Sequence, residues 1–586
     1  PPARSRDRRP VCAPHRAPPR GAARMKAPPR NPLLAQIVHT RHTFRRGWQL
    51  LRHRGPGQVQ FWFIALGLGI AAGAAAVLFR FGIETLQEAA YGADDLHRLH
   101  SFAETLDWWW IVAVPIAGGL AVGLLLQFLT PDGRVRAVAD VIEGAALHDG
   151  RVETKAGLTS TACSLITLST GGSTGREGPV VHLAALLSSW VSNAIRADGI
   201  TGRDLLGCAV AAAVSASFNA PIAGALFAME VVLRHFALHA FAPIVIAAAA
   251  GTVLGRLAFG DVTNFILPGG SVLEFYAEIP AFLLLGLLCG LVAVATMRAV
   301  FWAEDMGDTV QTRARLPLWA RPAATGALLG AIAVAFPHVI GVGYETTTRA
   351  LTGDLLLREA VIFCIVKVVA VAVTVAGRMG GGVFSPSLML GALTGLAFGL
   401  VATGLFPETS GAPTLYALAG MGAVAAAVLG APISTTLIVF ELTGDWQTGL
   451  AVMVAVSTST ALASRLVDRS FFLTQLERRG VHLAAGPQEY LLQIARVAGV
   501  MRGPMDDRAP DETRLWEMIG NGIYVDANAT LDAAMPIFEK SGLPFIPVVR
   551  LTGTDLAPEL QGALFHVDAL KAYNRALAAT AEEEHS

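Results

Sequence analysis

The sequence has few charged residues and few cysteines. Only 15 % of its 586 residues are Asp, Glu, Lys or Arg, whereas 53 % are hydrophobic. This composition argues against a soluble protein and predicts a polytopic membrane protein. The five cysteines show no Cys-x-x-Cys spacing, and four of them lie in apolar stretches. We therefore expect neither disulfides nor a bound metal, and no other cofactor.

The basic residues are unevenly distributed along the chain. The first 55 residues contain fourteen Arg or Lys and a single acid, Asp7. Because cytoplasmic segments of membrane proteins are enriched in Lys and Arg, we expect a cytoplasmic N-terminus. We also expect a cytoplasmic C-terminus and a location in the cell (inner) membrane. Residues 1–55 have little apolar periodicity, and we expect them to be disordered. We expect no nucleic-acid partner.

Apolar stretches recur from residue 61 to residue 464, which places a membrane domain at 56–480. Several stretches are too long for one span or are interrupted by Gly and Pro. We therefore expect an all-α membrane fold with more helices than spans, some of them tilted or re-entrant.

A charged pair interrupts one of these stretches. Residues 171–179 read GGSTGREGP, with twenty uncharged residues before Arg176 and eighteen after Glu177. A carboxylate at membrane depth is costly, so it normally faces a cavity and marks an ion or proton path. The glycines allow the backbone to leave helical geometry, and Pro179 suits the first turn of a new helix. A helix N-terminus at this depth is an anion site.

The sequence contains an internal repeat. Residues 219–230 (NAPIAGALFAME) match 430–441 (GAPISTTLIVFE), and the break that ends at Pro179 matches GGGVFSP at 380–386. The paired prolines are 211 and 207 residues apart, so one register relates two halves, at about 58–256 and 279–466. Paired interrupted segments indicate a transporter in which broken helices meet at the substrate site. Two helix N-termini at one point predict a small anion as substrate.

The composition changes after Arg465, and residues 481–586 are predicted to form a linker and a separate cytoplasmic domain. The pattern indicates a β-α-β-β-α unit, with strands at 522–525, 545–550 and 560–565 and helices at 530–541 and 567–578.

With these motifs, the chain resembles the CLC chloride channel and transporter family over about 58–480. GREGP at 175–179 and GVFSP at 382–386 match two family signatures, in order and with the Asn-Ala-Pro repeat between them. The resemblance implies an inverted-repeat helical bundle that forms a homodimer with one anion pathway per subunit. It implies that Glu177 gates the pathway and carries the proton in exchangers. It also implies anion binding at Gly175, Arg176 and Gly178 and at the backbone N–H groups of Val383 and Phe384.

Three positions depart from the family pattern. Ala137 stands where the family has an anion-binding serine, and Phe472 stands where it has a pore tyrosine. The preference for chloride over nitrate, bromide or bicarbonate is therefore open. Val231 occupies the position of the internal proton-transfer glutamate of many exchangers. Glu230 and Glu143 are the candidate substitutes, although Glu230, like its repeat partner Glu441, is equally suited to bracing a helix.

The C-terminal region resembles a single CBS motif. Asp568 stands where nucleotide-binding members have an Asp, but Phe565 occupies the position of their hydroxyl residue. We therefore expect a structural role rather than adenine nucleotide binding.

The sequence favours CLC-type transport of a small anion, and the resemblance implies that this anion is chloride. We expect the protein to contact membrane lipid. Proton-coupled exchange and a passive voltage- or pH-gated channel both remain open. A non-transporting membrane receptor or scaffold is a more remote alternative. An enzyme is not expected, because no nucleophile–base pair or metal cluster is evident.

Overall fold

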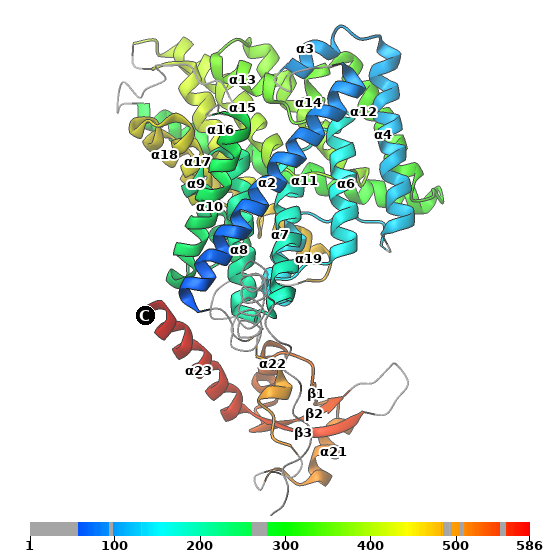
Figure 1. Ribbon diagram of the computed structural model, residues 1–586, viewed down its shortest axis with the longest axis vertical. Helices are drawn as coiled ribbons and strands as arrows, with labels where there is room; N and C mark the ends of the chain where they lie inside the picture. Colours follow the sequence, from blue (N-terminus) through cyan, green and yellow to red (C-terminus); the bar gives the residue numbers. More distant parts are fainter. Residues whose placement is uncertain are drawn as a thin grey trace, which may run out of the picture. The chain divides into compact units, whose positions relative to one another are not determined.

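The computed structural model describes residues 57–92, 98–130, 132–260, 278–408, 410–481, 483, 492, 495–503, 506, 509–550 and 558–585. The predicted N-terminal segment at 1–55 and most of the linker after residue 481 lie outside these ranges. Helices α2 to α19 form the membrane part, and a small α/β unit forms the C-terminal part (Figure 1).

The first half of the membrane part contains nine α-helices and one π-helical turn within the described residues. They are α2 (Gln58–Tyr91), α3 (Leu99–Ala103), α4 (Trp108–Leu129), α5 (Val138–Leu147), α6 (Thr154–Ser169), α7 (Glu177–Ile195), α8 (Gly199–Phe218), α9 (Pro221–Phe227), η2 (Ala228–Leu233) and α10 (Leu238–Phe259).

The second half has a corresponding series of helices. They are α11 (Ile279–Arg313), α12 (Ala320–Ala335), the 3-10 turn η4 (Pro337–Val339), α13 (Tyr344–Thr352), α14 (Leu357–Ala376), α15 (Phe384–Leu405), α16 (Pro413–Leu429), α17 (Pro432–Thr443), α18 (Trp446–Leu466) and α19 (Phe471–Arg478).

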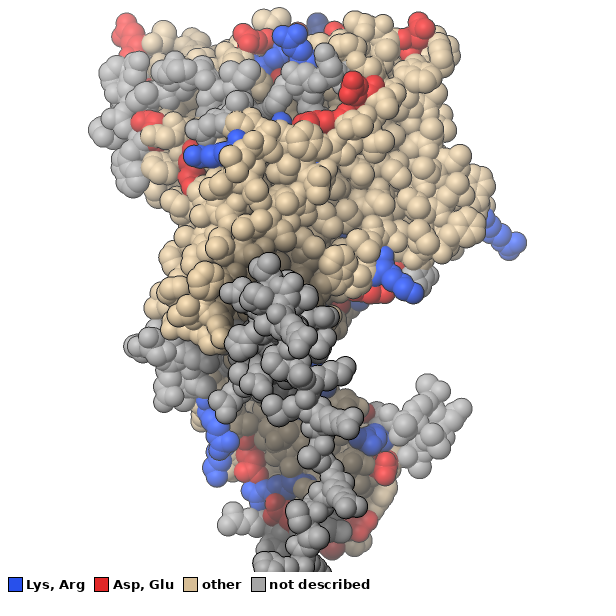
Figure 2. All heavy atoms as spheres, viewed as in Figure 1, with Lys and Arg blue, Asp and Glu red and all other residues tan. Residues whose placement is uncertain are grey.

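Eight helices among the described residues are long and apolar enough to cross a membrane, and four further apolar helices are shorter. α2 and α11 have 34 and 35 residues, well above the ~20 that span a bilayer, so they must tilt or extend beyond it. The expectation of more helices than spans is confirmed. Figure 2 shows a broad band of uncharged residues on one face of the membrane part, with charged side chains along its margins. Exposed apolar side chains such as Phe63 and Trp108 suit contact with lipid.

The repeat seen in the sequence is also a structural repeat. Asn219 and Gly430 end α8 and α16 in the left-handed conformation, with φ of 58° and 70°. Pro221 and Pro432 then occupy the first position of α9 and α17, where a missing N–H is tolerated. α9 and α17 pack against each other.

Reciprocal hydrogen bonds fix the direction of these two helices. The Glu230 carboxylate, which follows α9, accepts from the backbone N–H of Ser434 at the start of α17, at 2.7 Å. The Glu441 carboxylate, near the end of α17, accepts from the N–H of Ala223 at the start of α9, at 2.8 Å. The end of each helix therefore lies beside the start of the other. The two copies run antiparallel, as an inverted repeat requires.

The C-terminal part is built on a three-stranded sheet in the order β1-β2-β3, with β1 parallel and β3 antiparallel to β2. Its elements are η5 (Val497–Gly499), α21 (Glu512–Gly520), β1 (Val525–Asp526), α22 (Leu531–Ser541), β2 (Phe545–Arg550), β3 (Glu559–Phe565) and α23 (His566–His585). It has its own core, which includes Leu531, Ile546 and Leu564.

The predicted β-α-β-β-α order is confirmed, but the first strand is shorter and begins later than predicted. Gly522 has a φ of 76°, which is left-handed, so the chain is still turning at the position where a strand was expected. The strand is therefore limited to Val525 and Asp526.

Candidate anion pathway

The two glycine-rich breaks meet in the interior of the membrane part. The N–H of Gly175 donates to the carbonyl of Gly382 at 2.7 Å, and the N–H of Gly382 donates back to Gly175 at the same distance. These two bonds form an isolated antiparallel bridge between segments 207 residues apart. Because α7 begins at Glu177 and α15 at Phe384, the bridge holds two helix N-termini side by side. Their first N–H groups have no partner within the helices and create a positive potential.

Glycine is required where the breaks touch. A Cβ on residue 175 would lie 2.7 Å from the Glu177 Oε2 atom. Gly381 has a φ of 140°, and a Cβ there would lie 2.0 Å from the Thr174 hydroxyl. A side chain at either position would push the two loops apart or displace the carboxylate.

The Glu177 side chain closes this junction. It is only 3 % exposed, and its Oε1 atom accepts a hydrogen bond of 2.6 Å from the Ser385 hydroxyl. Its Oε2 atom is buried and has no hydrogen-bond partner among the described residues. A carboxylate oxygen therefore lies at the starts of both helices, where a mobile anion would find the same positive potential. Sequence reasoning does not single out Ser385, although it lies inside the GVFSP motif.

The Arg176 side chain is directed to neighbouring elements. Its Nη2 atom donates to the Ser217 carbonyl at 3.2 Å, and its guanidinium carbon lies 5.2 Å from the centre of the Tyr344 ring. Its Nε atom is 3.9 Å from Glu177 Oε1, at the limit of an ion pair. The two adjacent side chains are therefore in contact, although the contact is long and is not a hydrogen bond. Arg176 is the residue immediately before α7, so its backbone belongs to the junction.

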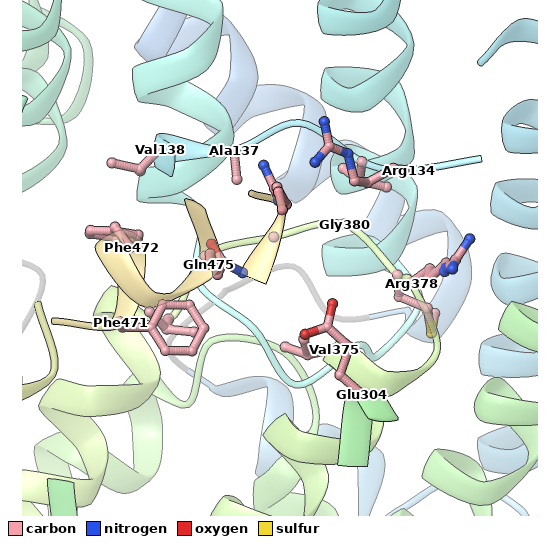
Figure 3. A pocket seen from close by; sticks show the side chains of 16 residues that line it. Arg134, Ala137, Val138, Glu304, Val375, Arg378, Gly380, Phe471, Phe472 and Gln475 are labelled. Carbon is pink, nitrogen blue, oxygen red and sulfur yellow. The ribbon is translucent and has the colours of Figure 1, made fainter. Parts of the chain in front are cut away.

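A cavity of about 90 Å³ lies on one side of the junction. It brings together the sequence-predicted positions Ala137, Val383 and Phe472. Figure 3 shows two of them, Ala137 and Phe472. Gly380, Gly381 and Gly382 supply backbone to its wall, and the charged side chains that line it are Arg134, Arg378, Arg479 and Glu304. Three of these four side chains are arginines, and their carboxylate partners, Asp140 and Asp308, are not among the residues that line the cavity.

The start of α5 is already capped in this cavity. The N–H of Ala137 donates to the Asp140 carboxylate at 2.8 Å, and Asp140 also pairs with Arg479 at 3.1 Å. Ala137 therefore offers neither a hydroxyl nor a free N–H to an anion. Phe472 is buried, and its ring lies edge-on to Phe471 at 5.9 Å between centroids. Both positions are apolar parts of the cavity wall.

The two candidate proton relays lie elsewhere. Glu143 is on α5, with its Oε1 atom 3.8 Å from His148 Nε2. The Glu230 carboxylate accepts from the N–H groups of Ile433 and Ser434 at the start of α17. Neither residue is among those that line the cavity.

The predicted nucleotide residue of the C-terminal part is engaged in an ion pair. The Nε atom of Arg502 lies 2.6 Å from Asp568 Oδ2, and the same guanidinium covers the Phe565 ring at 4.2 Å. The hydrogen bond to Asp568 raises the pKa of Arg502. One oxygen of the Asp568 carboxylate is therefore engaged by Arg502 in this conformation. In the described part of the chain, no three His, Cys, Asp or Glu side chains are grouped to hold a metal.

The family model described as "Voltage gated chloride channel" matches residues 118–464. A chloride channel protein described as ClcB-like, from Ralstonia nicotianae, is 32 % identical over 415 residues, which cover 70 % of this chain and 95 % of the relative. The voltage-gated ClC-type chloride channel ClcB of Escherichia coli is 30 % identical over 419 residues, which cover 70 % and 97 %.

The fold has solved counterparts as well. The crystal structure of a slow cyanobacterial Cl⁻/H⁺ antiporter superposes with a TM-score of 0.62 at 20 % identity, over 72 % of this chain and 97 % of the antiporter. The family match spans both glycine-rich breaks and both copies of the repeat. The protein is therefore a multi-pass membrane protein that belongs to the voltage-gated chloride channel (CLC) family.

Proposed function

We propose that this protein carries small anions, chloride among them, across the cell membrane, and that Glu177 is the gate. The observation that carries this proposal is the pairing of the α7 and α15 N-termini around a buried carboxylate. The curated relatives from Ralstonia nicotianae and Escherichia coli, which are named as chloride channels, support it.

The mechanism follows from competition for one site. The ionised carboxylate of Glu177 occupies the positive potential of the two helix starts and excludes a free anion. Protonation removes its charge and weakens its bond to the Ser385 hydroxyl, so the side chain can leave and an anion can take its place. When the anion moves on, Glu177 loses its proton and returns. A proton that enters on one side and leaves on the other makes this cycle an exchange.

A passive channel is the second candidate. Val231, at the position of the internal proton-transfer glutamate of many exchangers, is buried and apolar. Glu230 is committed to capping α17, and the one acidic residue that lines the described cavity is Glu304. This scarcity of acids favours anion flow without an obligatory proton route on the inner side.

The two candidates are separated by one experiment. Protein in liposomes is given a chloride gradient while isotopic chloride uptake and external pH are recorded together. Coupled exchange moves protons against their gradient, whereas a channel does not. Glu177→Gln should abolish proton movement while chloride flux persists, and Glu88→Gln, at an exposed position on α2, is the matched control. Unchanged proton movement in Glu177→Gln would remove Glu177 from the mechanism, and no chloride flux in the unaltered protein would overturn the function.

We further propose a homodimer with cytoplasmic termini. The symmetry-related Ile222 and Ile433, at the starts of α9 and α17, are 55 % and 47 % exposed, so the paired helices present apolar side chains outward. Such a face suits a second copy. Cross-linking of Cys introduced at these positions in native membranes should yield a dimer band, and its absence would count against this interface.

A further inference from the structure

The inner cavity contains one polar side chain that sequence reasoning does not single out. Gln475 lies on α19, three residues after Phe472, so the two side chains share a face of the helix, one turn apart. Both line the cavity. Figure 3 shows the Gln475 amide projecting from α19 into the space between Ala137, Gly380 and Glu304.

Each arginine that lines the cavity forms an ion pair with an aspartate. Arg378 Nη2 pairs with Asp308 at 3.0 Å, and Arg479 Nη1 pairs with Asp140 at 3.1 Å. Arg134 contributes a longer contact to Asp140, at 3.5 Å. Each of these guanidinium groups is held by a carboxylate, which offsets its charge and directs part of its N–H groups away from an anion.

The Gln475 amide, in contrast, is uncommitted. It makes no hydrogen bond to any of the described residues, and its side chain is half-buried. A carboxamide has two N–H donors, which can both point to one anion. Ala137 and Phe472 provide no hydroxyl, so Gln475 is the one uncharged side-chain donor among the described residues that line this cavity.

We propose that Gln475 is a direct ligand of the transported anion in the inner cavity and helps to determine which anion is taken. The ligand class is a small monovalent anion, with chloride and nitrate as representatives. This inference rests on the proposed transport function and adds a specificity residue to it. Phe472, on the first turn of α19, and Ala137, at the start of α5, have no hydroxyl group to bind an anion. The carboxamide of Gln475, on the second turn of α19, would bind it instead.

The test measures anion binding and transport on the same preparations. Purified protein is titrated with potassium chloride and potassium nitrate by calorimetry, and then reconstituted for chloride and nitrate flux. Gln475→Met keeps the size of the side chain and removes the donors. Because a hydrogen bond to a charged group is worth about 1.5 kcal/mol or more, the chloride dissociation constant should rise about tenfold, and the chloride-to-nitrate ratio should change. Leu473→Met, on the same helix and outside the cavity lining, should bind as the unaltered protein does.

A second variant, Gln475→Glu, distinguishes an effect on the anion from a loss of folded protein. Gln475→Glu keeps the shape and polarity of the side chain but places a negative charge at the proposed anion site. It should bind chloride more weakly than Gln475→Met at pH 7.5, and the deficit relative to the unaltered protein should shrink on acidification, when the new carboxyl is protonated. This pH dependence would show that residue 475 lies close enough to the bound anion for its charge to act on it, and the loss of affinity in Gln475→Met would then show that the amide donors themselves bind.

The outcomes separate the two claims. Unaltered protein that transports, together with Gln475→Met and Gln475→Glu variants that match it in affinity and anion ratio, would overturn the role of Gln475 and leave the proposed function standing. Unaltered protein that neither binds nor transports chloride or nitrate would overturn both.

Discussion

The reciprocal caps at α9 and α17 allow a decisive test of whether Glu230 carries protons. Glu230 and Glu441 are equivalent in the repeat. The carboxylate of each accepts hydrogen bonds from two backbone N–H groups at the start of the partner helix. If Glu230 only caps a helix, its substitution should have the same effects as substitution of Glu441. If Glu230 also relays protons, only its substitution should reduce proton movement. The perturbation is therefore Glu→Gln at each position, singly and together.

The expected loss of stability follows from the hydrogen bonds. The Glu230 bonds measure 2.9 and 2.7 Å, and those of Glu441 measure 3.0 and 2.8 Å. A hydrogen bond to a charged group contributes about 1.5–3 kcal/mol, with the lower end appropriate to partly exposed groups. Glutamine keeps one acceptor oxygen and turns an NH₂ group toward the other N–H. Each single variant should lose about 1.5–2 kcal/mol. Glu230→Gln should lose slightly more, because Glu230 also accepts from the Ser434 hydroxyl at 2.7 Å.

The assay has two readouts. Thermal unfolding in detergent should show similar decreases in Tm for the two single variants, on the order of 1–2 °C for each kcal/mol in a chain of this size. Chloride and proton movements in liposomes should be unchanged relative to each other in both variants. The double variant should lose roughly the sum in stability, since each carboxylate caps a different helix.

Two results would refute this reasoning. Loss of proton movement in Glu230→Gln but not in Glu441→Gln would make Glu230 a relay in addition to a cap. Unchanged Tm in both variants would show that the four backbone bonds contribute no net stability.

Three further predictions concern the junction. Ser385→Ala removes the hydroxyl that donates to Glu177, so chloride flux at neutral pH should rise severalfold, and an unchanged rate would show that this bond does not hold the gate closed. Gly175→Ala places a methyl group against Glu177 Oε2, so flux or yield of folded protein should fall about tenfold or more, as measured by uptake per monodisperse protein, and normal uptake would contradict the close approach. Ala137→Ser returns a hydroxyl donor to the cavity and should raise the permeability of chloride relative to nitrate about threefold, which is less than half of the contribution of one hydrogen bond to a charged group. Equal permeability ratios before and after would mean that residue 137 does not touch the anion.

Much of the junction could be predicted because it depends on residues with few conformational alternatives. Glycines shortly before Pro179 and Pro386 favour a break in the helix, and the similar spacing of the paired prolines in the two halves indicates that the breaks meet. The apolar lengths likewise predict more helices than spans, because a helix of 12 residues such as α17 is too short to cross a bilayer.

The partners of individual polar groups could not be predicted. Ser385 is one hydroxyl among many until α15 is placed against Glu177. Gln475 becomes a cavity residue only when the direction of α19 is known, and the Asp140 cap on Ala137 depends on a local turn. The predicted start of the first C-terminal strand lies before its true start at Val525, because the residue pattern does not reveal the turn at Gly522. In each case the sequence identifies the residue type, and the tertiary arrangement decides its role.

The double hydrogen bond between Gly175 and Gly382 limits how the molecule can move. Large movements of one half against the other, as in rocking carriers, would have to break both bonds in the interior of the membrane part. Motion confined to a carboxyl group and its immediate neighbours would leave them intact. The pairing thus favours a nearly rigid frame, in which substrate passes by small local rearrangements.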